Sequence, residues 1–301
     1  MEMKSVILFD KGTLWKKIVK TSAKALAAGA LLPIPTEYEF IEDGGVRFFV
    51  RILSNLVRKD EGKKKQAKKD GGATPFLPYE EALYVADISE SHVAVLNKFN
   101  VVDHHLLIVT RKFEDQETLL TLSDFEALMA CMAEYDGLGF YNGGAAAGAS
   151  QSHKHLQLVP LPLTPEGPGI PIEPLLAVAR FKDVLGLVPG FPFLHVFVRL
   201  DGGVISTKSA GAEEIFTNYC KMLRSVGLKP PSAKRGGRQS GPYCLIITRK
   251  WMLLVPRSRE FFEGISINSL AYAGALLVRN EKQMAVLKRC GPMKVLRGTA
   301  L

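Results

Sequence analysis

Cysteine is scarce in this sequence, and no two cysteines stand at the spacing of a metal-binding or redox motif. The chain has only four in 301 residues, all far apart: Cys131, Cys220, Cys244 and Cys290. A disulfide framework or a cysteine-based zinc site requires closely spaced pairs such as C-x-x-C. We therefore expect isolated, reduced thiols, which are typical of cytoplasmic proteins.

Long hydrophobic runs are also missing. A membrane-spanning helix needs about 18–20 consecutive apolar residues. The nearest approach, residues 22–35, is interrupted by Lys24 and ended by two prolines. The N-terminus lacks the basic, apolar and small-residue order of a secretory signal. The sequence thus predicts a cytoplasmic protein with no membrane partner.

Acidic residues are fewer than basic ones, and the imbalance favours an anionic partner. The formal net charge is +9, and residues 58–70 carry seven basic and three acidic side chains without apolar periodicity. This segment is a solvated loop, an electrostatic lure or lid for a polyphosphate, or a nucleic-acid surface. The aromatic residues that usually alternate with basic ones on nucleic-acid surfaces are missing, which argues against nucleic acid.

The rest of the chain shows both helical and strand periodicities. Helices are predicted over residues 14–31, 123–137, 212–228 and 269–291, and the second of these begins with a capping-box pattern at Ser123 and Glu126. Strands are predicted over residues 46–53, 92–100, 104–111, 138–142, 153–160 and 193–200, with a hairpin over 242–257. The order strand, strand, helix, strand, strand occurs in both halves, although more loosely in the second. No residue-level repeat accompanies it, so a duplication is a hypothesis only.

Three regions follow from this order. Residues 1–165 form an N-terminal half that contains the histidine motif described next. Residues 166–190 form a connector rich in proline and glycine, and residues 191–301 form a C-terminal region.

The segment "YNGGAAAGASQSHKHLQLVP", residues 141–160, concentrates the chemistry of the chain. Alternate residues of a strand share a face, so His153, His155 and Gln157 point one way while Leu156 and Leu158 pack on the other. The preceding small-residue loop can turn backbone N–H groups toward an oxyanion, with Ser150, Gln151 and Asn142 as additional donors. The loop is neither a P-loop nor a dinucleotide-binding fingerprint.

A phosphate-binding loop beside an imidazole suits phosphoryl chemistry. A neutral histidine can attack phosphorus when its other nitrogen is hydrogen-bonded and donors surround the phosphoryl oxygens. Lys98 or Arg111 would neutralise the remaining phosphates. On spacing alone, a metal site and a chance pairing stay open. At most one of the adjacent His104 and His105 can join such a metal site.

The segment "YNGGAAAGASQSHKHLQ" resembles the signature of diadenosine tetraphosphate phosphorylases, also called ATP adenylyltransferases, in the histidine-triad superfamily. "LNKFNVV", "HHLLIVTRKFEDQ", "WMLLVPR" and "GISINSLAYAGALLV" support the resemblance over most of the chain. It implies an α+β fold with a histidine-triad-like antiparallel sheet, flanking helices and a second half that completes the site.

The resemblance also implies a two-step reaction. His155 would attack the α-phosphorus of the dinucleotide and expel ATP, and phosphate would then release the adenylate as ADP. Gln157 would hydrogen-bond the phosphoryl group, since the branch with glutamine at this position transfers the nucleotidyl group and the branch with histidine hydrolyses it. His153 would orient the bridging region, and Ser150 would assist.

The matching blocks also imply the substrate contacts. They assign these to Lys59, Asn97, Lys98, Asn142, Gly148, Ala149, Ser150, Gln151, Asn268, Ser269, Leu270 and Arg279. The family implies magnesium or manganese bound with the polyphosphate, no organic cofactor and no histidine-bound metal. The partners would be small-molecule nucleotides and phosphate.

Two other functions remain alternatives. A hexose-1-phosphate nucleotidyltransferase shares H-x-H-x-Q, but such enzymes tend to have proline and glycine where this chain has Lys154 and Leu156, and they often carry zinc-binding cysteines. The other alternative is a nucleotide-binding protein that has kept the loop and lost the chemistry. The intact His155, Gln157 and Ser150 argue against it.

Overall fold

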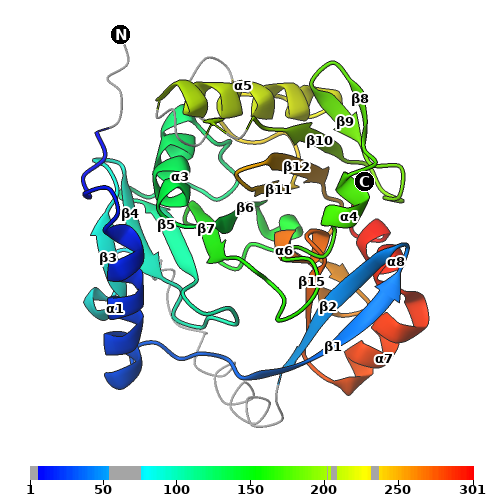
Figure 1. Ribbon diagram of the computed structural model, residues 1–301, viewed down its shortest axis with the longest axis horizontal. Helices are drawn as coiled ribbons and strands as arrows, with labels where there is room; N and C mark the ends of the chain where they lie inside the picture. The colour runs from blue at the N-terminus through cyan, green and yellow to red at the C-terminus, as the bar shows by residue number, and fades with distance from the viewer. Residues whose placement is uncertain (1–5, 54–75, 202, 205–208, 232–236) are drawn as a thin grey trace.

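The computed structural model describes residues 6–53, 76–201, 203–204, 209–231 and 237–301. The basic segment 58–70, with Lys59, lies outside the described residues. A ten-stranded sheet forms the centre of the molecule (Figure 1), and its neighbouring strands pair antiparallel. In spatial order the strands are β3 (Tyr84–Asp87), β4 (His92–Leu96), β5 (Leu106–Thr110), β7 (His155–Pro160), β6 (Gly137–Gly143), β11 (Tyr243–Ile247), β12 (Trp251–Pro256), β10 (Val196–Arg199), β9 (Leu185–Leu187) and β8 (Arg180–Lys182).

One face of this sheet is covered by three helices, α1 (Leu14–Ala27), α3 (Leu122–Glu134) and α5 (Ser209–Ser225). Their apolar sides meet alternate residues of the strands in a large core, which includes Leu128, Leu156 and Leu158. The alternation along β7 is therefore what the two-residue period of a strand requires.

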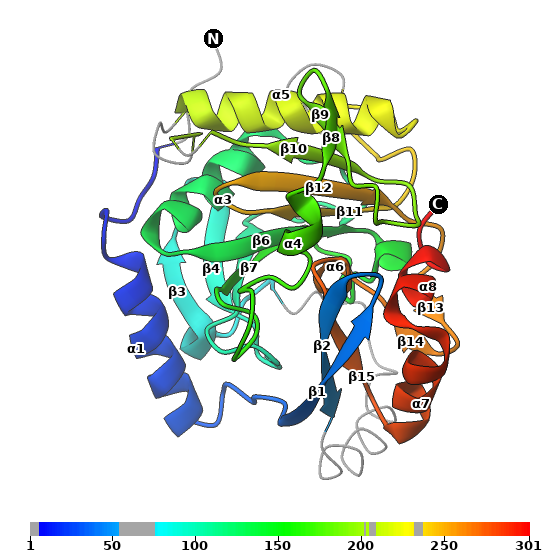
Figure 2. The ribbon, with the colours of Figure 1, turned by 45° about the vertical axis from the view of Figure 1, so that its right-hand side comes forward.

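The other face is covered by a second layer over part of its width. That layer is a small sheet of β1 (Thr36–Asp43), β2 (Val46–Leu53) and β15 (Ala275–Val278), which lies beside α7 (Glu281–Cys290) and α8 (Pro292–Arg297) (Figure 2). Phe48, Phe140 and Leu253 belong to its core. A separate apolar cluster of Phe76, Val93, Val95, Leu107 and Val109 covers the β3–β5 end of the same face.

The remaining elements are short. They are α4 (Glu173–Leu176), α6 (Ser269–Tyr272), β13 (Phe261–Phe262), β14 (Ile265–Ser266) and the 3₁₀ turns η1 (Glu81–Leu83) and η2 (Ala145–Ala147). The range expected to be a connector, 166–190, contains α4, β8 and β9, and the two strands extend the large sheet. No helix among the described residues is both long and apolar enough to cross a bilayer.

The C-terminal prediction of one helix over residues 269–291 is wrong. Gly274 adopts φ +91°, and a Cβ there would lie 2.5 Å from Cβ of Pro171, so the chain leaves the helix at a position that requires glycine. Residues 275–278 then pair in parallel with β2, which buries Leu276 and Val278. A second helix begins after Asn280, whose side chain accepts the Gln283 N–H.

The capping box of α3 also differs from the prediction. Its N-cap is Thr121, whose hydroxyl accepts the N–H of Asp124, while the Asp124 carboxylate accepts the N–H of Thr121. The helix begins earlier than the pair Ser123 and Glu126 indicates. Aspartate takes the place that glutamate usually has in this motif.

Candidate active site

Strand β7 brings His155 and Gln157 to the face of the sheet opposite α1, α3 and α5. His153 precedes the strand and is held by an isolated bridge to Asp115. The Phe76 ring lies 5.7 Å from the ring of His153 and 5.4 Å from that of His155, so the two histidines share a side. Their common face was predicted from the alternation alone.

The ring of His155 has a defined tautomer. Its Nδ1 lies 2.8 Å from the carbonyl oxygen of His153, so Nδ1 carries the proton and Nε2 keeps its lone pair. The side chain is 4% exposed, and burial lowers its pKa to about 4 although the hydrogen bond to the His153 carbonyl opposes the shift. The imidazole is therefore neutral near pH 7, the form that can attack phosphorus.

His153 is held differently. Its Nε2 lies 2.8 Å from the carbonyl oxygen of Thr110 and 3.0 Å from the Thr110 hydroxyl, and the residue is fully buried. Burial lowers the pKa of this ring too. The contacts with Thr110 fix the position of the His153 backbone, whose carbonyl oxygen accepts the hydrogen bond from Nδ1 of His155.

Gln116 is a residue that the sequence prediction did not include. Its side-chain oxygen accepts the N–H of His155 at 2.8 Å, and its amide group donates to the carbonyl of Asn142 at 2.9 Å. It therefore ties β7 to β6 where both meet the small-residue loop. Its place in "FEDQ", one of the blocks that carry the family resemblance, is the signal that would have found it.

The loop after β6 packs against the C-terminal region. Gly148 adopts φ +92°, and a Cβ on it would lie 2.8 Å from Cβ of Asn268 and from the carbonyl oxygen of Ile267. Asn142 accepts the N–H of Ser269 at 2.9 Å and its hydroxyl at 2.7 Å. Ala149 and Gln151 are half-buried, and Ser150 is exposed beside them. The second half of the chain thus completes the surroundings of the loop.

Arg257, in the block "WMLLVPR", forms hydrogen bonds that hold this loop in place. The residue is 1% exposed, and its guanidinium donates to the carbonyl oxygens of Ala147, Thr299 and Arg259 at 3.1, 3.0 and 2.8 Å. It also lies 3.1 Å from Sγ of Cys244. A buried cation next to the loop favours anions there.

Lys154, between the two histidines, points to the opposite face and is fully buried. Its ammonium group donates to Asp124 at 2.7 Å, Glu114 at 3.1 Å and the carbonyl of Leu119 at 3.2 Å. Burial raises the pKa of Asp124, but the charge of Lys154 and the hydrogen bond from His92 outweigh it and hold the pKa well below its usual range. This network fastens the histidine strand to the first turn of α3.

Of the other predicted residues, the two asparagines bond residues next to the motif or its loop, and the three basic residues bond other groups. Asn97 bonds His105, whose ring lies beside Gln157, and Asn268 accepts the N–H of Leu270 as the cap of α6. Lys98 instead pairs with Glu80 at 2.6 Å, and Arg111 pairs with Asp87. Arg279 is exposed at the end of β15, with its N–H bonded to Gln283.

The metal alternative gains no ligand set from this arrangement. His104 turns to the Ser22 hydroxyl at 3.0 Å, away from His105. Among the described residues no three His, Cys, Asp or Glu side chains gather where they could hold a metal ion.

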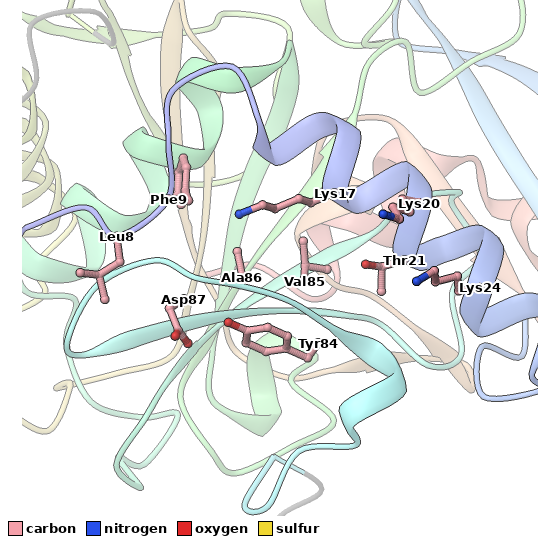
Figure 3. A pocket seen from close by; sticks show the side chains of 10 residues that line it. All are labelled: Leu8, Phe9, Lys17, Lys20, Thr21, Lys24, Tyr84, Val85, Ala86 and Asp87. Atoms are coloured by element: carbon pink, nitrogen blue, oxygen red, sulfur yellow. The ribbon is translucent and has the colours of Figure 1, made fainter.

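A separate hollow of about 440 Å³ lies between α1 and the edge strand β3 (Figure 3). Lys17, Lys20 and Lys24 of α1 line one side, and Tyr84 and Asp87 line the other. It contains none of the predicted site residues. Part of the positive charge of the chain therefore lies away from the histidine motif.

The fold and this site first define a class. An antiparallel α+β sheet that presents H-x-H-x-Q beside a glycine-containing loop is the arrangement predicted from the family resemblance, and its fold class is confirmed. Residues 4–178 match the model of the Ap4A phosphorylase N-terminal domain, and residues 189–301 match that of the ATP adenylyltransferase C-terminal domain. The chain belongs to the diadenosine tetraphosphate (Ap4A) phosphorylase family.

Two yeast proteins show the extent of the similarity. The chain is 27% identical over 262 residues to diadenosine 5',5'''-P1,P4-tetraphosphate phosphorylase 2 of Saccharomyces cerevisiae, covering 79% of this chain and 78% of the relative. It is 25% identical over 263 residues to Protein APA1 of the same yeast, covering 78% and 76%. The crystal structure of yeast Ap4A phosphorylase Apa2 superposes with a TM-score of 0.78 at 22% identity, over 98% of this chain and 99% of that one. The fold is therefore shared throughout.

Proposed function

We propose that this chain carries out reversible nucleotidyl transfer: with inorganic phosphate it cleaves diadenosine tetraphosphate to ATP and ADP. The family match and the names of the yeast relatives support this substrate. The observation that carries the mechanism is the state of His155, a buried neutral ring whose Nδ1–H is bonded to the carbonyl of His153.

In the first step, Nε2 of His155 attacks the phosphorus that bears one adenosine. The bond from that phosphorus to the bridging oxygen breaks, and ATP leaves. The ring becomes cationic in the adenylyl-histidine, and the His153 carbonyl 2.8 Å from Nδ1 stabilises that charge. His153 would thus orient the reacting ring through its backbone.

In the second step, an oxygen of inorganic phosphate attacks the same phosphorus. The nitrogen–phosphorus bond breaks, its electron pair returns to Nε2, and the product is ADP. Gln157 donates to a phosphoryl oxygen in both steps, and the loop from Gly148 to Gln151 surrounds the phosphates with donors. Reversal of the steps makes the dinucleotide from ATP and ADP.

A divalent cation such as magnesium or manganese fits this scheme as part of the substrate complex. Because the described residues gather no metal-ligand cluster, the cation would take its ligands from phosphate oxygens and water. It would neutralise charge on the polyphosphate and on the departing ATP. Neither step needs an organic cofactor.

We place the reaction in the cytoplasm. All four cysteines are unpaired, and a reducing compartment keeps thiols in that form. The substrates proposed here are small-molecule nucleotides, and no nucleic acid takes part.

The test is product analysis with diadenosine tetraphosphate and labelled inorganic phosphate. The expected result is ATP and ADP in equal amounts, with label only in the ADP. Without phosphate, ATP should appear in a burst that matches the enzyme concentration while one adenylate stays on the protein. Two molecules of ADP, or AMP with ATP, would instead identify a hydrolase.

A further inference from the structure

His105 is a buried histidine beside the motif with an unpaired ring nitrogen. The residue is 7% exposed, and Nε2 has no hydrogen-bond partner among the described residues. Leu107 pairs directly with Gln157 across β5 and β7, so His105 lies next along the same face. The side chain of Gln157 lies beside the ring and acts to raise its pKa, although the two groups are not aligned as a hydrogen bond.

The proton on this ring can be placed from its neighbours. The backbone N–H of Phe99 donates to Oδ1 of Asn97 at 3.3 Å, which fixes the orientation of the Asn97 amide. The NH₂ group of Asn97 therefore faces Nδ1 of His105, at 3.1 Å. A nitrogen that accepts a hydrogen bond carries no proton, and burial lowers the pKa of the ring to about 4, so the single proton of the neutral ring is on Nε2.

The protonated Nε2 determines how Gln157 must turn. A side-chain amide can meet an N–H only with its oxygen, so Oε1 faces His105 and the NH₂ group remains for the reaction. We infer that Asn97 and His105 are positioning residues that hold the Gln157 amide with its NH₂ group toward the transferred phosphoryl group. This inference rests on the proposed function, and it adds the device that makes Gln157 a donor.

The reverse orientation would be unfavourable. An amide oxygen directed at a phosphoryl oxygen places two acceptors face to face and removes a charge-assisted hydrogen bond. Nothing in glutamine itself prevents that orientation, because the oxygen and the NH₂ group of its amide have nearly the same shape. The His105 tautomer selects between them.

The tautomers can be measured directly by nitrogen NMR of protein labelled in its histidine rings. We expect a proton on Nε2 of His105 and on Nδ1 of His155, so the two histidines of this site should be opposite tautomers. His195 is the internal control, because its Nδ1 faces the Phe193 carbonyl at 2.8 Å and its Nε2 accepts the Val188 N–H at 2.8 Å. A proton on Nδ1 of His105 would overturn the inference whether or not the chain cleaves diadenosine tetraphosphate.

Kinetics supply the second arm through a double-mutant cycle. His105→Phe should lower kcat about 10- to 100-fold with a smaller change in KM, and it should cost little more when Gln157 is already alanine. His105→Gln, which keeps an N–H donor at a similar reach, should recover part of the rate. The matched control, His104→Asn, should leave kcat unchanged. Equal losses from His105→Phe with Gln157 present and absent would show that His105 does not act through Gln157.

Thermal unfolding of each variant separates positioning from folding. If His105→Phe unfolds, the cycle is repeated with His105→Gln and Asn97→Ala, and the same coupling to Gln157 is required. If no variant and no wild-type protein forms ATP and ADP, the proposed function fails and the NMR result still decides the tautomer.

Discussion

The two halves of the large sheet share one strand order, and only the first half carries the long small-residue loop. From the centre outward the first half runs β6, β7, β5, β4 and the second runs β11, β12, β10, β9, with α3 and α5 at equivalent places. Strands β7 and β12 both end in Leu-Val-Pro, and the two prolines pair with Gly137 and Tyr243 at the start of β6 and β11. The duplication suggested by the element order is therefore present in the topology.

This register shows which positions of the two halves are equivalent. Counting back from the prolines, His155 is equivalent to Trp251 and Gln157 to Leu253. Residues 144–154 join β6 to β7, whereas residues 248–250 alone join β11 to β12. Trp251 donates to Glu173 at 3.1 Å and packs on Phe197. The strand order is common to both halves, and only the first half carries the histidine motif and its long loop.

The comparison extends to a second histidine. Leu106 pairs with Leu158 as Val196 pairs with Leu254, so His105 and His195 occupy equivalent places. Both nitrogens of His195 are bonded to the backbone, whereas Nε2 of His105 is left facing Gln157. Histidines at equivalent positions of the two halves therefore have different hydrogen-bond partners.

The largest expected effect separates His155 from its counterpart. His155→Ala removes the nucleophile, so kcat should fall by about a thousandfold or more and no adenylate should remain on the protein after acid quenching. Trp251→Phe, the matched change in the second half, should keep kcat within about threefold, because Trp251 bonds Glu173 and packs on Phe197, and neither contact involves the histidine motif. A His155→Ala protein that still carries the adenylate would move the nucleophile elsewhere.

Lys154 and Lys250 sharpen the comparison further, since they are equivalent in register. Lys154→Met removes the ammonium group that pairs with the buried carboxylate of Asp124, and the free energy of unfolding should drop by about 3–5 kcal/mol. Lys250 is exposed, so Lys250→Met should change it by about 0.5 kcal/mol or less. Urea unfolding measures both. Equal effects would mean that Lys154 contributes no more than a surface charge.

Acid should destabilise the protein mainly by protonating groups of the first half of the sheet. His155 and His105 have folded pKa values near 4 against an ordinary value of 6.5, so below pH 6.5 the unfolded chain binds protons that the folded chain does not. The contribution of these two rings to the free energy of unfolding is fully present above pH 6.5. It is lost as the pH falls toward 4, by up to roughly 3 kcal/mol for each ring.

Urea unfolding at pH 7 and pH 5 measures this loss. His155→Phe and His105→Phe should each make the difference between the two pH values smaller. A difference that neither substitution reduces would assign the acid sensitivity to other groups.

The sequence predicted the parts of this site that local period controls. The shared face of His153, His155 and Gln157, and the burial of Leu156 and Leu158, follow from strand alternation. The contacts of Asn97, Gln116 and Arg257 could not be predicted in the same way, because their side chains reach the site from segments that only the folded chain brings together. The strand over residues 275–278 was missed since its apolar residues also fit a helix, and only pairing with β2 decides between them.

The smallest expected effect concerns the loop that one half has and the other lacks. Gly148→Ala combines a φ of +92° with a Cβ 2.8 Å from the Ile267 carbonyl oxygen, and backbone as close as this must shift. Gly227→Ala has a similar φ of +80° but open space around its Cβ, so it isolates the cost of the backbone conformation. That conformational cost is about 1 kcal/mol, and it should appear in the unfolding free energy of both variants. Only Gly148→Ala should also raise KM for the dinucleotide, because only there does the shift move the donors that surround the phosphates. If KM stays the same in both variants, the loop supports the fold and does not bind the polyphosphate.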